Sequence, residues 1–388
     1  MKKLPPLVEA STALTADEAA RYLRQTVIPE IGALGQARIR NAKVLSIGAG
    51  GLGSPVLMYL AAAGVGTLGI IDFDRVDTSN LQRQIIHGEG DVGRLKTESA
   101  REAINQINSA VQVIEHNVAI TRDNAMEIIA GYDIVIDATD NFATRYLIND
   151  ACVLLNKPCI WGSIFRFDGQ ASVFWSSHGP CYRCLHPEPP AKELAPNCAV
   201  GGVFGVLCAT IGSLQATEAI KLVTGVGESM IGTITVYDAL TSTFDRVPLN
   251  KDPECPICGS NPTQTELLDD YEAFCSISLF DQGSDDMVNE ITVDDLRALQ
   301  NSGTAIDLID VREENEWAEG YIPGARLIPQ GEFFSGAALA DVSKDSDIVV
   351  YCRSGRRSMD VAKVLVEAGY PKVVNVIGGI LAWNESGN

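Results

Sequence analysis

The chain has few positive charges for its length. Its 388 residues include 30 Lys and Arg against 50 Asp and Glu, which gives a formal net charge of −20 at pH 7. A field of this sign repels the phosphates of nucleic acids and anionic lipids, so we expect no nucleic-acid and no membrane partner. Any phosphate that the protein binds must therefore meet a local group of cations.

Long apolar runs are also absent. The stretches 56–71 and 199–216 are interrupted by Gly, Ser, Thr or Gln and do not suit a membrane span. Near the N-terminus Pro5 and Pro6 precede Glu9, which leaves no apolar core for a secretory signal. Ten cysteines without such a signal favour a reducing compartment where thiols serve metals or catalysis, so we expect a cytoplasmic protein.

The sequence does contain enough apolar residues for packed domains. Its hydrophobic fraction is 46% and its charged fraction 21%, and the length exceeds what one hydrophobic core usually supports. Composition turns polar and acidic after Cys258, notably over 281–286. We therefore predict a first domain over 1–262, a linker over 263–288 and a second, smaller α/β domain over 289–388.

The first domain begins with a βαβ pattern. An apolar strand at 43–47 leads into Gly48-Ala-Gly-Gly-Leu-Gly53, followed by a helix at 55–63 and a strand at 67–72. Further apolar runs at 132–137 and 158–161 lie between helical segments, and 170–175 and 232–237 look like antiparallel additions. These patterns predict an α/β fold with a Rossmann-like, mostly parallel sheet.

The glycine loop suits a phosphate, since glycines let the backbone approach it and the next helix adds its positive end. Asp72, at the end of the next strand, is placed to bind ribose hydroxyls. The same pattern fits a nicotinamide-dependent dehydrogenase or a turn without a ligand. Arg83, Lys96 and Asp140 favour ATP with Mg²⁺, because triphosphate chemistry needs cations and a metal-binding carboxylate, although single surface charges are common.

Residues 20–260 resemble adenylyltransferases of the MoeB/ThiF type, relatives of the ubiquitin-activating enzymes. The resemblance lies in Arg21-Tyr-Leu-Arg-Gln25, the glycine loop, 79–84 and 138–141, in the same order and spacing. It implies a homodimer in which Arg24 reaches the neighbouring subunit's ATP, where the alternative is a surface arginine. It also implies that ATP is bound by Gly51, Asp72, Ser79, Asn80, Leu81, Gln82, Arg83, Lys96, Asp140 and Asn141, with Arg83 and Asp140 catalytic and Asp140 the magnesium ligand.

Two Cys-x-x-Cys pairs follow, Cys181 with Cys184 and Cys255 with Cys258. Each pair places two thiolates on a tight turn, so together they can close a tetrahedral Zn²⁺ site of structural type, although a single pair can also be redox-active. MoeB-like proteins carry zinc at these positions. Cys198 stands alone between Pro196 and Gly201: it is either an inert cysteine or, as the resemblance implies, a thiol that forms a covalent link with a carrier.

A second loop of different chemistry, Cys352-Arg353-Ser354-Gly355-Arg356-Arg357, follows a buried-type strand at 347–351 and precedes a helix at 356–368. Such a loop can direct backbone N–H groups and a helix N-terminus at an anion, and its arginines favour the thiolate or persulfide form of Cys352. Cysteine phosphatases use a longer loop, with the arginine one residue later. The smaller ring fits sulfur better than phosphate, and the alternative is an inert strand-end cysteine.

Residues 290–388 resemble a rhodanese domain. The shared motifs are Asp310-Val-Arg312, Gly320-Tyr-Ile-Pro-Gly-Ala325, the Cys352 loop and Gly378-Gly-Ile-Leu-Ala-Trp383, with Tyr321 at a position where histidine is common. The resemblance implies that Cys352 carries a persulfide.

Together the two resemblances imply an adenylyltransferase and sulfurtransferase that acts on a small ubiquitin-like sulfur carrier protein of the MoaD/ThiS type, ending in Gly-Gly. The sulfur donor would be thiosulfate or a cysteine desulfurase, and molybdopterin biosynthesis is the expected pathway, with thiamine, cysteine or tRNA thiolation as alternatives. A dehydrogenase fused to a rhodanese and a non-catalytic rhodanese scaffold are the alternatives of another class.

Overall fold

The computed structural model describes residues 3–189, 202–271, 274, 288–301 and 305–385. The chain divides into two compact units, residues 1–281 and 282–388, and each is described by itself. Among the described residues, no helix combines the length and the apolar character that crossing a bilayer requires.

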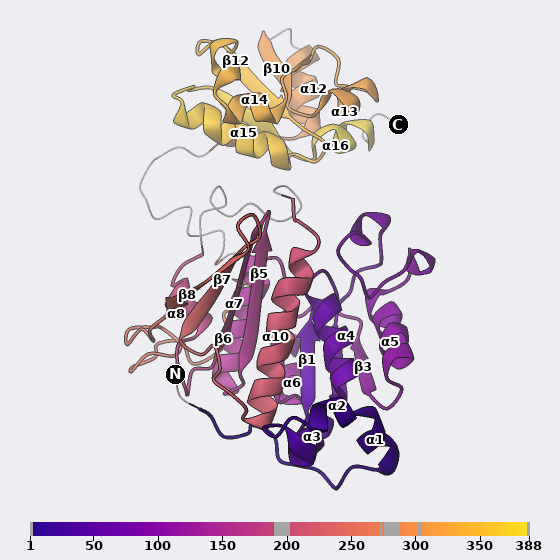
Figure 1. The fold of residues 1–388 in the computed structure, drawn as a ribbon. Coiled ribbons are helices and arrows are strands. Elements are labelled where there is room, and N and C mark those ends of the chain that lie inside the picture. The colour runs from indigo at the N-terminus through magenta and orange to yellow at the C-terminus, as the bar shows by residue number, and fades with distance from the viewer. Residues whose placement is uncertain (1–2, 190–201, 272–273, 275–287, 302–304, 386–388) are drawn as a thin grey trace. The chain divides into compact units, whose positions relative to one another are not determined.

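The first unit is built on one eight-stranded sheet in the order β3-β2-β1-β4-β5-β6-β7-β8 (Figure 1). The first five strands along the chain are parallel, and β6, β7 and β8 add an antiparallel extension, so the predicted sheet type is confirmed. The strands are β1 (Lys43–Ile47), β2 (Thr67–Ile71), β3 (Gln112–His116), β4 (Ile134–Asp137), β5 (Cys159–Phe165), β6 (Asp168–Phe174), β7 (Thr233–Asp238) and β8 (Thr243–Pro248).

Helices cover both faces of this sheet. In Figure 1, α4 and α10 lie side by side on the near face, and α6 and α7 lie behind the strands. Val44 belongs to the core on the first face and Leu45 to the core on the second, as the two-residue period of a strand requires. The helices are α1 (Ala16–Arg21), α2 (Leu23–Thr26), α3 (Gly32–Asn41), α4 (Gly53–Ala63), α5 (Lys96–Ile107), α6 (Arg122–Ala130), α7 (Phe142–Leu154), α8 (Tyr182–Leu185) and α10 (Leu207–Thr224), with 3-10 turns η1 (Thr78–Asn80) and η2 (Glu89–Asp91).

The glycine loop connects β1 to α4 through a turn that requires glycine. Gly48 has a φ of +102°, which other residues rarely adopt. A Cβ atom on Gly53 would lie 2.1 Å from the carbonyl oxygen of Gly48, so the loop closes on itself more tightly than any side chain permits.

The second unit is a five-stranded parallel sheet in the order β11-β10-β12-β13-β9. Val350 and Val361 pack on one face, and Val349 and Leu296 on the other. This confirms the small α/β fold. The strands are β9 (Asn289–Ile291), β10 (Ile306–Asp310), β11 (Arg326–Leu327), β12 (Asp347–Tyr351) and β13 (Val373–Val376), and the helices are α12 (Val293–Asn301), α13 (Glu314–Ala318), α14 (Gln330–Phe334), η4 (Ala337–Ala340), α15 (Arg356–Glu367) and α16 (Gly379–Glu385).

The first part of the predicted linker is packed against the first unit. Gln264 and Tyr271 each donate a hydrogen bond of 2.8 Å to the Asp150 carboxylate, which is fully buried. Arg183 binds the same carboxylate through two further bonds of 2.8 Å, and its guanidinium lies 4.6 Å from the ring of Phe274. Gln264, Tyr271 and Phe274 thus contact the buried ion pair between Asp150 and Arg183.

Candidate functional site

The glycine loop, Asp72 and residues 138–141 follow three adjacent parallel strands. β1 pairs with β2 on one side and with β4 on the other, so the chain leaves all three strands at the same edge of the sheet. The strand order reverses between β1 and β4, and such a switch point is where open α/β sheets bind ligands. The fold therefore brings these three predicted segments together.

Gly51 and Arg83 are neighbours across this edge. A Cβ atom on Gly51 would lie 3.6 Å from Cγ of Arg83 and 2.7 Å from Sγ of Cys208, so the loop has no space for a side chain here. The Arg83 guanidinium donates to the backbone oxygen of Ser79 at 3.0 Å. The cation is thus held beside the glycine loop.

Residues 79–82 form the turn that carries Arg83. Asp77 accepts a hydrogen bond from the backbone N–H of Ser79 at 2.8 Å, and Asn80 accepts one from the backbone N–H of Asp77 at 3.2 Å. Ser79 and Gln82 are exposed, whereas Asn80 and Leu81 are half-buried. The turn presents polar groups to solvent next to the loop.

Asp72 and Lys96 lie on either side of Asp74. The Asp72 carboxylate accepts the backbone N–H groups of Ala49 and Asp74, both at 2.9 Å, and burial raises its pKa against the opposing effect of Lys96. Lys96, the first residue of α5, is nearly buried and donates to the Asp74 carboxylate at 2.8 Å. A partly desolvated carboxylate and an ordered ammonium group therefore flank the loop.

Asp140 and Asn141 lie between β4 and α7. Asn141 is the N-cap of α7 and accepts the backbone N–H of Thr144 at 2.8 Å, so its side-chain oxygen has a structural task. Asp140 is exposed. Asp137 is buried and accepts two bonds from Thr139, and burial raises its pKa. Asp140 is the carboxylate of this turn that is open to a metal ion.

Two buried residues at this edge were not predicted from the sequence. His87 contacts the Ala49 carbonyl oxygen at 3.0 Å and the Ser99 hydroxyl at 2.8 Å, and burial lowers its pKa, which favours the neutral imidazole. Arg145 donates to the carbonyl oxygen of Thr139 at 3.0 Å, and its buried Nε has no hydrogen-bond partner among the described residues. The i, i+4 spacing of Arg145 from the predicted Asn141 is the signal that could have identified it.

Arg24 and Cys198 are the remaining predicted residues of the first unit. Arg24 is exposed on α2, and Cys198 lies outside the described residues. The apolar stretch 199–216 contains the start of α10, which begins at Leu207 and extends to Thr224.

The four predicted metal-binding cysteines come together. Their Sγ atoms lie within 4.8 Å of one another, with 3.6 Å between Cys181 and Cys255 and 3.4 Å between Cys184 and Cys258. A tetrahedral ion with metal–sulfur bonds of about 2.3 Å needs sulfurs about 3.8 Å apart, so the set fits zinc. Contact with Cys184 raises the pKa of Cys181, and contact with Cys181 lowers the pKa of Cys184 to about 7, so the thiols do not ionise independently.

The Cys352 loop lies between β12 and α15. Cys352 is buried, and its carbonyl oxygen accepts the backbone N–H of Ile380 at 2.9 Å. Gly355 has a φ of +91° and is the N-cap of α15. A Cβ atom on Gly379 would lie 2.3 Å from the carbonyl oxygen of Cys352, so the first turn of α16 can close on the loop only because glycine is present there.

The arginines of this loop differ in environment. Arg353 and Arg356 are exposed, as is Ser354. Arg357 instead donates two hydrogen bonds to Glu316 of α13, a residue that was not predicted as part of the site. The Arg357 partner holds the pKa of Glu316 at about 2.

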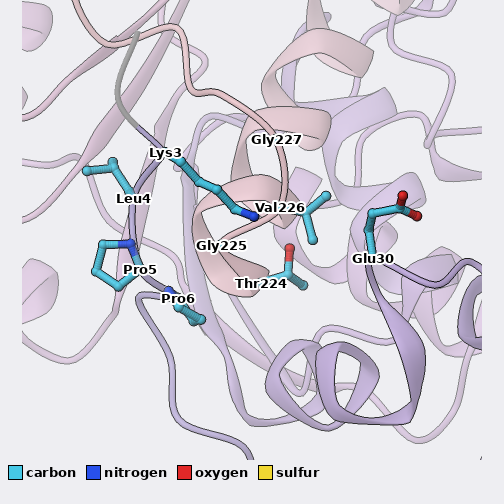
Figure 2. Close-up of a pocket in the computed structure, with 9 residues that line it drawn as sticks. All are labelled: Lys3, Leu4, Pro5, Pro6, Glu30, Thr224, Gly225, Val226 and Gly227. Carbon is cyan, nitrogen blue, oxygen red and sulfur yellow. The ribbon is translucent and has the colours of Figure 1, made fainter.

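A separate cavity of about 520 Å³ lies at the C-terminal end of α10 (Figure 2). It is lined by Lys3, Glu30 and Thr224 among others. Along α10, Thr224 is about 24 Å from Cys208, which borders the glycine loop. This cavity therefore does not belong to the edge of the sheet where the predicted ATP residues gather.

A ThiF family model matches residues 22–257 and a Rhodanese-like domain model matches residues 292–386. The chain therefore belongs to the ThiF family and carries a C-terminal rhodanese-like domain, so it is an adenylyltransferase and sulfurtransferase. This confirms the resemblance and the enzyme class, and it favours neither a dehydrogenase nor a non-catalytic scaffold.

Relatives of this class share its whole length. The probable adenylyltransferase/sulfurtransferase MoeZ of Mycobacterium tuberculosis is 50% identical over 384 residues, 98% of this chain and 96% of that protein. The adenylyltransferase and sulfurtransferase MOCS3 of Mus musculus is 40% identical, with 98% and 88% covered. Among solved structures, E. coli MccB with ATP has a TM-score of 0.55 at 24% identity and covers 62% of this chain and 75% of that chain, which shows a common fold.

Proposed function

We propose that the protein adenylates the C-terminal glycine of a small ubiquitin-like sulfur carrier protein with ATP and Mg²⁺, and then transfers sulfur to it from a persulfide on Cys352. The observation that carries the proposal is the presence of an adenylyltransferase domain and an arginine-rich cysteine loop on one chain. Adenylation activates a carboxylate toward nucleophiles, and a persulfide is the nucleophile that turns it into a thiocarboxylate.

In the first step the carrier carboxylate attacks the α-phosphorus of ATP. The bond to the β-phosphate breaks, pyrophosphate leaves and an acyl adenylate forms. Arg83 and Lys96 stabilise the negative charge that develops on the phosphates, and Asp140 holds the magnesium ion, which neutralises further charge. Asp72 binds the ribose, and Gly51 leaves the backbone free to approach the phosphates.

In the second step the terminal sulfur of the Cys352 persulfide attacks the acyl carbon. The bond to AMP breaks, and the carrier is joined to Cys352 through an acyl disulfide. A second thiolate, which we assign to Cys198, attacks the Cys352 sulfur and releases the carrier thiocarboxylate. The remaining disulfide between the two cysteines needs a cellular dithiol as reductant before the next cycle.

The remaining groups have supporting roles in this proposal. The cysteine cluster binds structural zinc, because a site closed by four thiolates leaves no position for a reactant. A homodimer brings Arg24 to the neighbouring active site. Molybdopterin biosynthesis is the pathway we propose, in the cytoplasm, with thiamine, cysteine and tRNA thiolation using the same chemistry.

Reconstitution tests the proposal. Full-length protein is incubated with ATP, MgCl₂, thiosulfate and purified carriers of each pathway that end in Gly-Gly, and the carriers are then analysed by mass spectrometry. We expect one carrier to gain the mass that corresponds to replacement of one oxygen by sulfur, only when ATP and the sulfur donor are both present. Conversion of every carrier without ATP would contradict the adenylation step.

A further inference from the structure

The last arginine of the Cys352 loop is already bound to a carboxylate. Arg357 donates from Nη1 to Oε2 of Glu316 at 2.7 Å and from Nη2 to Oε1 at 2.6 Å. Glu316 also accepts the backbone N–H of Glu313 at 3.2 Å. The two side chains are 32% and 22% exposed, so the pair is partly desolvated and its geometry is bidentate, the form in which such pairs are strongest.

This ion pair changes the charge beside the reactive sulfur. The hydrogen bonds to Glu316 are the main cause that raises the pKa of Arg357. Arg357 lies in the first turn of α15, at the end of the Cys352 loop, and Glu316 lines the same cavity as Arg353 of that loop. With Glu316 attached, the pair has no net charge. Of the three loop arginines, only Arg353 and Arg356 are exposed to an incoming anion.

The cavity next to the Cys352 loop is likewise lined by equal numbers of positive and negative side chains. It has a volume of about 690 Å³ and is lined by Arg312, Arg353, Glu316 and Glu319. Arg312 is bound to the buried Asp310 carboxylate at 2.7 Å. Two carboxylates therefore line the cavity, of which Glu316 is paired with Arg357, and of its two guanidinium groups Arg312 is paired with Asp310.

One wall of this cavity is apolar. Tyr321 stacks on Trp317 with ring centroids 4.1 Å apart and an interplanar angle of 6°. Tyr321 is 52% exposed and Leu381 is 46% exposed, and both line the cavity. Such a surface offers contact area to an organic group, whereas a small oxyanion gains little from it.

We propose that Glu316 determines which sulfur donor loads Cys352: by neutralising Arg357, it disfavours small dianionic donors and favours donors whose sulfur is carried on a less charged organic group. The inference rests on the proposed loading of Cys352. In that step the Cys352 thiolate attacks the outer sulfur of the donor. A new S–S bond forms, and the donor's own bond to that sulfur breaks with its electron pair going to the leaving group, sulfite from thiosulfate or methanesulfinate from methanethiosulfonate.

The two donors just named differ by one negative charge and suit a direct test. Full-length wild type, Glu316→Gln, Glu316→Asp and Glu314→Gln are compared for sulfur transfer from each donor to cyanide. We expect Glu316→Gln to raise kcat/KM for thiosulfate by roughly 5- to 30-fold, mainly through KM, and to raise it for methanethiosulfonate by about the square root of that factor. Glu316→Asp keeps the charge, and Glu314→Gln removes an exposed charge from the same helix, so both should keep the wild-type ratio between donors.

Each outcome decides one claim. An unchanged donor ratio in Glu316→Gln, or the same gain in Glu314→Gln, would overturn the role of Glu316 and leave the proposed function intact. Failure of the wild type to form a persulfide on Cys352 with either donor, read by mass spectrometry, would overturn the proposed function as well. Circular dichroism melts check folding. If Glu316→Gln does not fold, Arg357→Gln provides the reverse test: it should lower thiosulfate transfer more than methanethiosulfonate transfer, and an equal loss for both donors would contradict the proposal.

Discussion

The glycine loop and the Cys352 loop both follow a buried strand and precede a helix, yet they treat charge in opposite ways. Beside the glycine loop, burial raises the pKa of Asp72. Its carboxylate accepts hydrogen bonds from two backbone N–H groups, those of Ala49 and Asp74. Beside the Cys352 loop, the Arg357 guanidinium holds the pKa of Glu316 at about 2. Without a ligand, burial destabilises the charged form of Asp72 at the first site. At the second site, the charges of Glu316 and Arg357 compensate each other before any ligand binds.

This difference fits what each site would receive. A nucleotide brings hydroxyl groups, phosphates and a metal ion, which together can satisfy Asp72, Lys96 and Asp140. A sulfur donor transfers a single atom, and the rest of the donor must then leave. A loop whose charge is already compensated binds an anionic leaving group less tightly and so lets it dissociate. The following predictions separate the two loops experimentally, from the largest expected effect to the smallest.

Replacement of the sulfur nucleophile should separate the two activities completely. We expect Cys352→Ala to abolish persulfide formation and sulfur transfer, because no other group in the loop can carry the sulfur. Carrier-dependent exchange between ATP and pyrophosphate should be unaffected. Loss of both activities in this variant would contradict the division of labour between the loops.

The reverse separation uses the exposed carboxylate after β4. We expect Asp140→Ala to lower ATP–pyrophosphate exchange by roughly 100- to 1,000-fold, as removal of one group that stabilises transition-state charge typically does. Sulfur transfer from thiosulfate to cyanide should be unchanged. Asp123→Ala, an exposed aspartate at the start of α6, serves as control. Wild-type exchange in Asp140→Ala would refute the magnesium assignment.

Metal removal should affect only one of the two units. Treatment with a chelator, or the Cys181→Ser change, should destabilise the first unit by several kcal/mol, because a closed structural zinc site contributes directly to folding. Calorimetry should then show a lower transition for the first unit, while thiosulfate transfer persists at temperatures where that unit has unfolded. Cys152→Ser, a buried cysteine outside the cluster, controls for loss of packing. Equal loss in both units would place the metal elsewhere.

The opposite pKa shifts predict opposite responses to pH. The pKa of Asp72 is raised in the folded state, so the charged carboxylate lowers the free energy of unfolding as the pH rises above the ordinary value near 3.8. Asp72→Asn should therefore stabilise the first unit at pH 7 by about 1 kcal/mol or less, while weakening ATP binding.

The pKa of Glu316 is lowered in the folded state, so the stabilisation that its charged carboxylate provides is present above about 4.5 and is lost as the pH falls toward 2. Glu316→Gln should cost about 1 kcal/mol at pH 7 and less at pH 3, measured by urea unfolding. A pH-independent difference in either variant would contradict the assigned shift.

Local sequence patterns predicted well those strands that are buried on both faces of a sheet. The strands at 43–47 and 347–351 match the predicted apolar runs, because parallel strands buried on both faces are mostly apolar, with Ser46 as a buried polar residue in the first of them. The start of α10 could not be placed from the sequence, since the apolar run before Leu207 contains the glycines 201, 202 and 205 and does not mark a boundary.

Pairs made by the fold could not be predicted from spacing. Glu316 and Arg357 come from different elements of the second unit, and His87 reaches the carbonyl oxygen of Ala49 from a separate turn. Taken alone in the sequence, Glu316 and Arg357 look like surface charges and His87 looks like an isolated histidine. By contrast, the cysteine cluster was predictable, because each Cys-x-x-Cys pair already holds half of the site on one turn.

The hydrogen bonds from Gln264 and Tyr271 to Asp150 limit how far the sulfur can travel. Counted from residue 262, the chain up to Val288 could extend about 94 Å, but from Phe274 it can extend only about 50 Å. A shorter tether raises the effective concentration of the Cys352 persulfide within its reach, roughly with the −3/2 power of tether length. In the proposed mechanism, the hydrogen bonds to the buried carboxylate of Asp150 would thus make encounters between the Cys352 persulfide and the acyl adenylate more frequent.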